Sequence, residues 1–421
     1  MLLVLLLLVQ APASTCPDVA TCRADAQAAA ARGDFETFHD LAWRTVQKGR
    51  PNDPDLMYLL ARAQALSGRP GDALVMLGRI ADLGGTTDAA TSPDFAVARL
   101  LPAWPDVEAK LRGQSAPAAA VASPAAAPPT ARAPADAPAS SVPVASSPAA
   151  SLAPRDALEF DAPGLEPLGL AHDAVSRRFV LGDRKAHRLL VIDEVSRRVV
   201  NYVSAASAGF YDELTALTVD ARRGDLWVAS VKGEPDAASS ILHKLQLVSG
   251  RGLMEARAAD TTSPVRLVDV TVAPDGVVYA LDWIESRIFR LRPGAKALEL
   301  VMRLDARRPT ALTAADDHIL YVAADTGVVR VDVSARSASA VKSVEDLTDF
   351  ESLGWRNGAL IGVQRVAGSS LIVRIPLDAS GARAQPRHIL AASPVATVGA
   401  LAGDAYYYLA DGHTIRRIPL R

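Results

Sequence analysis

The sequence has few of the residues that several familiar classes of site require. Only two of its 421 residues are cysteines, which excludes a disulfide-rich scaffold and a zinc site built from cysteines. The seven histidines are scattered without His-x-x-x-His or His-Glu-x-x-His spacing, so we expect no zinc site of the metalloprotease type. The sequence also contains no Gly-x-Ser-x-Gly motif, no phosphate-binding loop and no Gly-x-Gly-x-x-Gly motif.

Excess charge of either sign is absent as well. The 45 lysines and arginines are balanced by 47 aspartates and glutamates, giving a formal net charge of -2. Nucleic-acid binding normally needs a basic face, so we expect no nucleic-acid partner. Aromatic residues make up 5% of the chain although hydrophobic residues make up 49%, which predicts a core built mainly from alanine, valine and leucine. A chain of this length is long enough for two or three domains.

The N-terminus has the pattern of an export signal. Residues 1–9 are apolar, and Ala11-Pro12-Ala13 follows as an Ala-x-Ala cleavage pattern. Nine apolar residues cannot span a bilayer, which takes about 20 residues in a helix. The pattern therefore predicts a signal peptide over 1–13 and a periplasmic or secreted protein. No later stretch is long enough to predict a membrane span.

The two cysteines, Cys16 and Cys22, stand at the start of the predicted mature chain. In an oxidising compartment we expect a disulfide between them. The alternative is a lipoprotein whose acyl anchor is attached to Cys16. The residues before Cys16, Ala13-Ser14-Thr15, lack the leucine and the small residue usual for that processing, so we favour the disulfide.

Composition divides the rest of the chain into three regions: a helical domain over 16–112, a linker over 113–155 and a β domain over 156–421. In the first, apolar residues recur at helical spacing, for example at Leu56, Leu59 and Leu60. With Ala61, Ala73 and Leu77 at packing positions, this region resembles about two degenerate tetratricopeptide repeats. A generic stack of helical hairpins is the alternative, and either structure would serve as an interaction or spacer module. The second region is rich in alanine, proline and serine, which predicts a disordered linker.

The β domain contains a repeat. Short apolar runs end in Asp or Asn, and these ends lie 41 to 55 residues apart, which is the size of a propeller blade. Aspartate and asparagine suit the turn that would follow. The runs end at Asp173, Asp220, Asp275, Asp316, Asn357 and Asp404. We therefore predict a β-propeller of six blades, with five or seven as the competing counts, and we expect residues 158–160 to supply the outermost strand of the last blade.

Residues 166–173 and 272–282, the second of which contains a Pro-Asp-Gly turn before a strand, resemble the six-bladed propellers of the regucalcin/gluconolactonase and NHL-repeat type. The resemblance implies a calcium ion or another divalent metal in the central tunnel. It also implies that a glutamate at the position of Glu166 is a ligand and that Asp269 is a ligand and catalytic base. The asparagine ligands of those proteins do not carry over, because none of the three asparagines of this chain begins an inner strand.

Acidic residues lie just before the expected inner strands, at Glu166, Glu213, Asp269 and Glu351. Strands of a propeller converge at the tunnel mouth, and clustered carboxylates are what Ca²⁺ or Mg²⁺ needs. A metal held there could polarise an ester or lactone carbonyl while a carboxylate activates water. The alternative is an acidic tunnel lining that is merely solvated.

Three aromatic residues, Phe210, Tyr211 and Trp283, fall in loops beside the inner strands. They could form a ligand-binding rim, or they could pack within their own loops.

These patterns support two hypotheses on function. The first is an exported ligand- or protein-binding scaffold of a bacterial envelope, whose partner is an envelope protein or a small molecule, and in which the linker lets the two domains move independently. The second is a metal-dependent lactonase or esterase of the gluconolactonase type. A further variant of the first has the linker spanning a polymer such as peptidoglycan while the propeller senses a partner.

Overall fold

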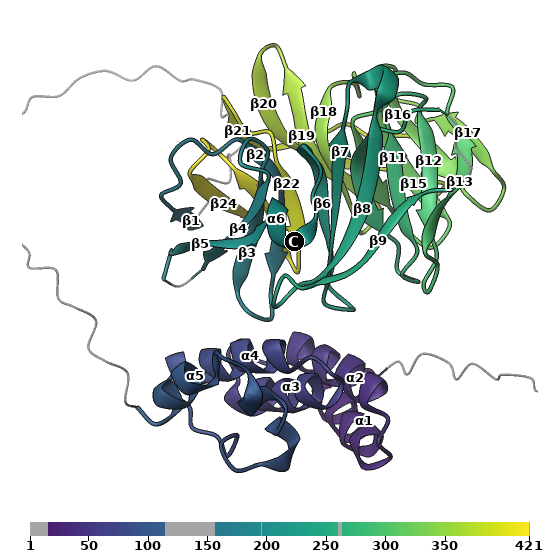
Figure 1. Cartoon of the computed structure of the whole chain (residues 1–421). Coiled ribbons are helices and arrows are strands. Elements are labelled where there is room, and N and C mark those ends of the chain that lie inside the picture. Colours follow the sequence, from purple (N-terminus) through teal and green to yellow (C-terminus); the bar gives the residue numbers. More distant parts are fainter. Residues whose placement is uncertain (1–15, 114–155, 195, 260–262, 421) are drawn as a thin grey trace, which may run out of the picture.

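The computed structural model describes residues 16–113, 156–194, 196–259 and 263–420, which form a helical part and a larger all-β part (Figure 1). The predicted signal peptide and almost all of the predicted linker lie outside the described residues. Within the described residues, no helix combines the length and the apolar character needed to cross a membrane.

The helical part is a series of consecutive helices, each packed on the next. Aspartates accept hydrogen bonds from amides of the first turn in the first three helices, at Asp18, Asp34 and Asp53. Cys16 forms a disulfide with Cys22, as the sequence predicted. The helices are α1 (Val19–Ala31), α2 (Phe35–Lys48), α3 (Pro54–Leu66), α4 (Pro70–Asp82) and α5 (Trp104–Leu111), with short 3₁₀ turns η1 (Pro93–Phe95) and η2 (Ala98–Leu100).

The β part is built from antiparallel meanders of four strands, in which each strand pairs with the next in sequence. The first three meanders consist of β2 (Pro167–Asp173), β3 (Arg178–Asp183), β4 (Arg188–Asp193) and β5 (Val199–Ser204); β6 (Glu213–Asp220), β7 (Asp225–Lys232), β8 (Ser239–Gln246) and β9 (Gly252–Ala258); and β10 (Leu267–Val272), β11 (Val278–Asp282), β12 (Arg287–Leu291) and β13 (Ala297–Arg303). The short helices α6 (Ala205–Ala208) and η3 (Pro235–Ala237) lie in the connections.

The next sheets repeat this plan. They consist of β14 (Ala311–Ala314), β15 (Ile319–Ala324), β16 (Gly327–Asp332) and β17 (Ser337–Ala340); β18 (Phe350–Arg356), β19 (Ala359–Val366), β20 (Ser369–Pro376) and β21 (His388–Ser393); and β22 (Gly399–Ala402), β23 (Ala405–Leu409) and β24 (Thr414–Pro419) with β1 (Asp156–Glu159).

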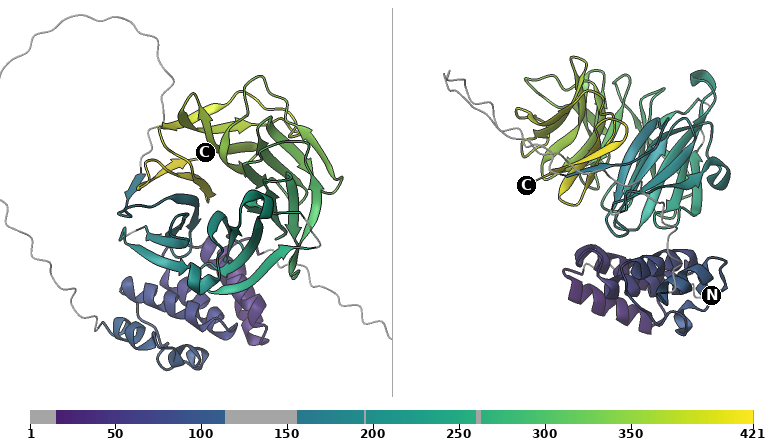
Figure 2. Two further views of the ribbon diagram at one scale, coloured as in Figure 1. Left: turned by 45° about the horizontal axis from the view of Figure 1, so that its top comes forward. Right: turned by 90° about the vertical axis from the view of Figure 1, so that its left-hand side faces the viewer.

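The first strand of each meander lies innermost, and these inner strands form a closed ring. Going round, β2, β6, β10, β14, β18 and β22 each contact the next, and β22 contacts β2 (Figure 2). The predicted turns at the ends of inner strands are also found: the Asp173 carboxylate accepts hydrogen bonds from the Val175 and Ser176 amides. Apolar faces of neighbouring sheets pack against each other, as Leu181 does in one cluster with Leu409.

The ring is closed by the beginning of the β domain. Strand β1 pairs with β24 and places Leu158 opposite Ile415, so the last meander takes its outermost strand from the other end of the domain. This is the closure that the sequence predicted for residues 158–160.

A second link joins two sheets at their outer edges. Strands β9 and β13 pair in parallel, with Ala297 opposite Arg257 and Leu298 opposite Ala258. The Ala259 amide adds a hydrogen bond to the Leu298 carbonyl. The meanders β6–β9 and β10–β13 therefore form one eight-stranded sheet.

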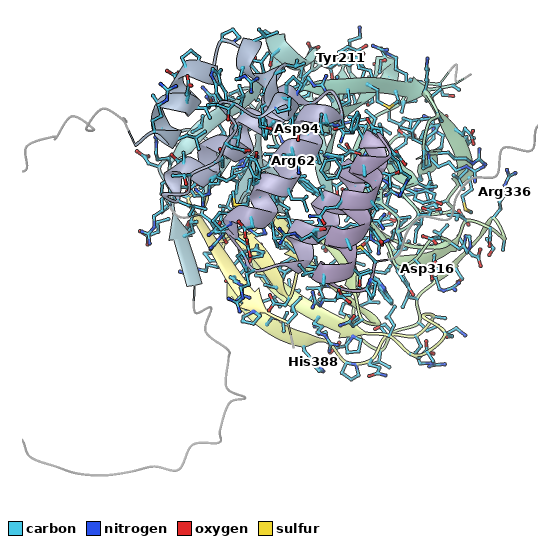
Figure 3. All side chains as sticks on the ribbon, turned by 90° about the horizontal axis from the view of Figure 1, so that it is seen from below. Arg62, Asp94, Tyr211, Asp316, Arg336 and His388 are labelled. Carbon is cyan, nitrogen blue, oxygen red and sulfur yellow. A yellow bond between two sulfur atoms is a disulfide. The ribbon has the colours of Figure 1, made fainter. Side chains whose placement is uncertain are left out.

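The helices lie against one face of the propeller (Figures 1 and 3). The Trp43 indole N–H donates to the Ala221 carbonyl over 2.6 Å, and Arg79 lies 3.4 Å from Asp193. One apolar cluster includes side chains of both parts, among them Trp43 and Leu247. The expectation that the two parts move independently is therefore not supported, because a shared apolar core holds them together.

Candidate functional site

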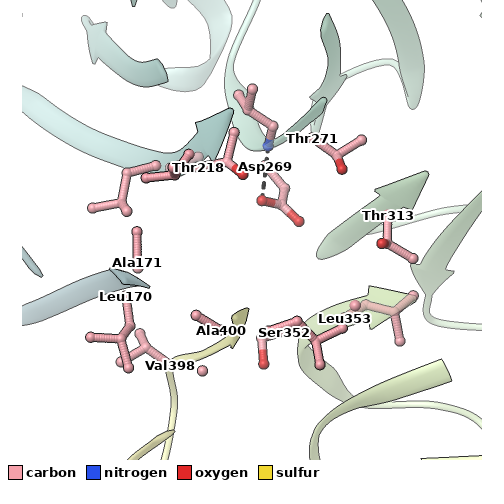
Figure 4. A pocket seen from close by; sticks show the side chains of 18 of the residues that line it. Leu170, Ala171, Thr218, Asp269, Thr271, Thr313, Ser352, Leu353, Val398 and Ala400 are labelled. Carbon is pink, nitrogen blue, oxygen red and sulfur yellow. Dashed lines mark hydrogen bonds between the residues drawn. The ribbon is translucent and has the colours of Figure 1, made fainter. Parts of the chain in front are cut away.

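The ring of inner strands encloses a cavity of about 880 Å³ at the axis of the propeller. Every inner strand contributes to its wall. Figure 4 shows side chains of several of these strands facing the same space. The wall alternates apolar side chains with hydroxyl groups, and its hydroxyl-bearing residues include Thr215, Thr218, Thr271, Thr313 and Ser352.

Four inner strands carry a β-bulge near the end at which they begin. At each bulge, one residue has no partner on the neighbouring strand, and all of these residues line the cavity. Bulges often occur beside active sites, where they redirect side chains. The unpaired residues are Gly169 in β2, Thr215 in β6, Val268 in β10 and Glu351 in β18.

Asp269 follows the bulge of β10 and is the acidic residue in the middle of the wall. One of its oxygens, Oδ1, accepts a hydrogen bond from the Val270 amide (2.8 Å), and Oδ2 accepts one from the Leu312 amide (2.6 Å). Burial raises the pKa of Asp269 to about 7, although the Leu312 and Val270 amides oppose that rise. A carboxyl group with this pKa can donate or accept a proton near neutral pH.

One mouth of the cavity carries a chain of ionic groups. Glu213 binds Arg184 through Oε1 (2.5 Å) and Arg266 through Oε2 (2.7 Å), and both arginines line the cavity. Burial disfavours the charge of Glu213, but Arg266 and Arg184 hold its pKa below the usual range. Trp283, which is 39% exposed, also lines this mouth.

The opposite end of the cavity meets helix α2. Trp43 and Gln47 line the cavity there, and both donate hydrogen bonds to the Ala221 carbonyl. The Trp43 ring packs over Gly224, where a Cβ atom would lie only 3.0 to 3.2 Å from three ring carbons. The helical part thus supplies a piece of the cavity wall.

The four predicted metal ligands are not brought together. Glu166 is exposed, Glu213 is bound by two arginines, and Glu351 binds Arg365 through Oε1. In residues 16–113, 156–194, 196–259 and 263–420, no three His, Cys, Asp or Glu side chains form a group that could hold a metal ion. The register explains this result: Glu351 is itself the bulged residue of its strand, whereas Asp269 follows a bulge, so the acids occupy different positions along their strands.

The residues present therefore do not fit the calcium or other divalent metal that the resemblance implied. The asparagine ligands are missing from the sequence, and arginines already bind two of the carboxylates.

The three predicted rim residues have different environments. Phe210 is buried and packs edge-on against His243, with 5.0 Å between ring centroids. The Tyr211 ring lies under the Lys232 ammonium group, 4.5 Å away, and does not line the cavity. Only Trp283 of the three lines the cavity mouth.

Four residues of the cavity wall were not predicted from the sequence: Trp43, Gln47, Arg184 and Arg266. Nothing in the sequence points to Trp43 or Gln47, because their role depends on how α2 packs against the propeller. Arg184 directly follows the second strand of its repeat, and Arg266 directly precedes an inner strand. Their positions next to strands of the repeat are the sequence signal that marks these two arginines.

No family model matches the sequence, and the search of curated proteins gave no match. Solved structures do match the β part. The major allergen Mala s 1 of Malassezia sympodialis aligns over 62% of this chain and 96% of its own, with 14% identity and a TM-score of 0.50. A gluconolactonase of Xanthomonas campestris aligns over 62% of this chain and 88% of its own, with 16% identity and a TM-score of 0.45. A virginiamycin B lyase of Staphylococcus aureus aligns over 63% and 99%, with 12% identity and a TM-score of 0.46. At these identities the likeness concerns the fold alone, and the β part of this chain is a β-propeller.

Proposed function

We propose that this chain is an extracytoplasmic binding protein whose propeller, of six blades, holds a small molecule in its central cavity. The observation that carries the proposal is the cavity itself: about 880 Å³, enclosed by every inner strand and bordered at one end by helix α2. Ligand sites are typically concave, of about 300 to 1,000 Å³, with mostly apolar walls and a few placed polar groups. The blade count takes the eight-stranded sheet as two blades, and the helices would be a degenerate tetratricopeptide-like module.

The disulfide supports the proposed compartment. Such bonds persist in the periplasm and outside the cell and are rare in the cytosol. The bond between Cys16 and Cys22 occupies the sulfur that a lipid anchor on Cys16 would need. The expected signal peptide over 1–13 agrees with export.

The proposal can be tested by filling the cavity. Thr313 lies in the cavity wall, whereas Ser337 lies exposed on an outer strand. A ligand raises the midpoint of thermal unfolding in proportion to its saturation. We would screen small molecules against the unmodified protein and against the variants Thr313→Trp and Ser337→Trp. A ligand of the cavity should raise the unfolding midpoint of the unmodified protein and of Ser337→Trp, but not that of Thr313→Trp. Shifts that both variants retain would place the ligand elsewhere, and no shift with any compound would refute the proposal.

One observation favours a second candidate, a hydrolase or lyase that uses acid–base catalysis. Asp269 faces the cavity, and its pKa of about 7 suits a general acid or base at neutral pH. On this hypothesis, the turnover of a lactone or ester should persist when a chelator is present. Its rate should rise with pH, with a midpoint near pH 7, and it should be lost in Asp269→Asn. Turnover that is absent, or unaffected by Asp269→Asn, would refute it.

A further inference from the structure

We propose that the ligand is an amphipathic organic anion that enters the cavity tail first and leaves its charged head at Arg184 and Arg266. The inference rests on the proposed function, since it concerns the same cavity. It follows from the difference between the two ends of the cavity: one end carries the arginines, and the other is mainly apolar, with Gln47 and Asp173 as its polar side chains.

The charged head would lie beside two guanidinium groups, each of which has N–H donors that are not used in hydrogen bonds with other described residues. Each arginine side chain carries five N–H donors in a planar fork that suits a carboxylate or phosphate. Among the described residues, Arg184 and Arg266 each direct one side-chain hydrogen bond, and both go to Glu213. Glu213 does not line the cavity, whereas both arginines do. The remaining donors are therefore available to an anion at this mouth.

The acidic groups of the wall do not cancel this preference. Glu351 lines the same mouth, but its Oε1 accepts hydrogen bonds from Arg365. Asp269, in the middle of the wall, is easily protonated because burial raises its pKa to about 7. Near neutral pH, Arg184, Arg266 and Arg365 carry three positive charges around this mouth, which exceed the charges of Glu213 and Glu351 and the partial charge of a half-ionised Asp269.

The opposite end offers an apolar surface. Val175, Val219 and Leu247 line it, together with the ring of Trp43. The Trp43 N–H already bonds to the Ala221 carbonyl, so the ring presents carbon atoms. The polar side chain of Asp173 is also occupied there, by Ser176 and by Arg178 at 3.4 Å. An apolar tail is the kind of group that this end can bury without leaving a hydrogen bond unmade.

The length of the cavity sets a limit on the tail. Strand β2 (Pro167–Asp173) runs from the arginine mouth to the helical end, and at a rise of about 3.3 Å per residue it is roughly 20 Å long. A saturated chain of ten carbons with its carboxylate fits within that length. Decanoate is therefore a suitable probe.

Calorimetric titration of the full chain tests the proposal. We expect decanoate to bind at least tenfold more tightly than 1-decanol, and decyltrimethylammonium to bind more weakly than either. In Arg184→Gln/Arg266→Gln, the affinity for decanoate should fall at least tenfold while the affinity for 1-decanol stays unchanged. Arg292→Gln is the matched control, because Arg292 is half-exposed and binds Glu299 away from the cavity. Its decanoate affinity should equal that of the unmodified protein.

The tail is tested separately. Ala314 lines the cavity near its helical end. In Ala314→Phe, the affinity for decanoate should fall more than the affinity for hexanoate, because only the longer tail reaches this position.

Equal affinity for decanoate and 1-decanol, or an unchanged preference in the double arginine variant, would overturn the amphipathic-anion inference. In either case the cavity could still be a binding site for a neutral ligand. A neutral fluorescent probe, N-phenyl-1-naphthylamine, separates the two failures when it is tested with Thr313→Trp. If this probe and every other compound that binds the unmodified protein also bind Thr313→Trp, the proposed function itself fails.

Discussion

The strongest quantitative prediction concerns Asp269, whose carboxyl group is costly to ionise. Its folded-state pKa of about 7 lies above the value of 3.8 expected in the unfolded chain. Between these values the folded protein binds more protons than the unfolded one, so stability falls as the pH rises from about 4 to about 7. Below about 4 the carboxyl is neutral in both states, and its ionisation costs nothing.

The magnitude follows from the difference between the two pKa values. One pKa unit corresponds to 1.36 kcal/mol, so full ionisation of Asp269 costs the folded state about 4 kcal/mol at most. Unfolding entropy near 2.1 cal/mol/K per residue, over a propeller of roughly 260 residues, converts this to about 7 °C in the unfolding midpoint.

Asp269→Asn isolates this contribution. Its amide cannot ionise, but it loses one of the two acceptor oxygens that bind the Val270 and Leu312 amides, which costs about 1 to 3 kcal/mol at every pH. The variant should therefore unfold at a lower temperature than the unmodified protein at pH 4, and the deficit should vanish or reverse by pH 8.

Scanning calorimetry of both proteins at one-unit steps from pH 4 to pH 8 checks this. The relevant quantity is the difference between the two midpoints, since the titration of all other groups cancels in it. A difference that stays constant with pH would show that Asp269 ionises normally. It would also remove the argument for acid–base catalysis.

Three further predictions concern the joints of the fold. Trp43→Phe should keep an aromatic ring but lose the hydrogen bond to Ala221, which lowers the free energy of unfolding by about 1 kcal/mol. Trp43→Ala should lower it by about 3 to 5 kcal/mol and should speed the release of the helices by trypsin. Unchanged proteolysis would argue against the shared core. Deletion of all residues through 159 should leave the outer edge of β24 unpaired and cause concentration-dependent aggregation in light scattering, and a stable monomer would contradict the closure. Replacing Cys16 and Cys22 by serine should lower the stability of the helical part by about 2 kcal/mol, because the disulfide no longer restricts this short loop in the unfolded chain. Denaturant titrations measure this loss, and no change would mean that packing alone fixes this turn.

Much of the fold could be predicted because the turns of the propeller are encoded locally. Asp173 and Asp220 end inner strands as expected, since a carboxylate that binds the next amides needs no distant partner. The closing strand was also predictable, because a meander that stops after three strands leaves an open edge. The parallel link of β9 to β13 was not, because it depends on how far two outer strands diverge.

The site was harder to predict, because its geometry depends on bulges and on docking. A bulge changes which side of a strand a residue faces, and the acids of successive inner strands sit at different distances from theirs. A pattern of acids at strand starts therefore predicted a cluster that the register separates. The contribution of Trp43 came from a helix more than a hundred residues earlier in the chain, and no local periodicity reports such a contact.

The short parallel pairing of β9 with β13 has a consequence for how this ring resists opening. Elsewhere in the described sheets the outer strands do not pair with one another, although Lys342, just after β17, bridges to Arg383 in the β20–β21 connection of the next sheet. Leu298 and the Ala259 amide join the outer strands β9 and β13, so neither strand can separate from its sheet without disturbing the other. Amides of β9 and β13 should exchange with deuterium at one common, slow rate, while those of β5 and β21 exchange earlier and independently of each other.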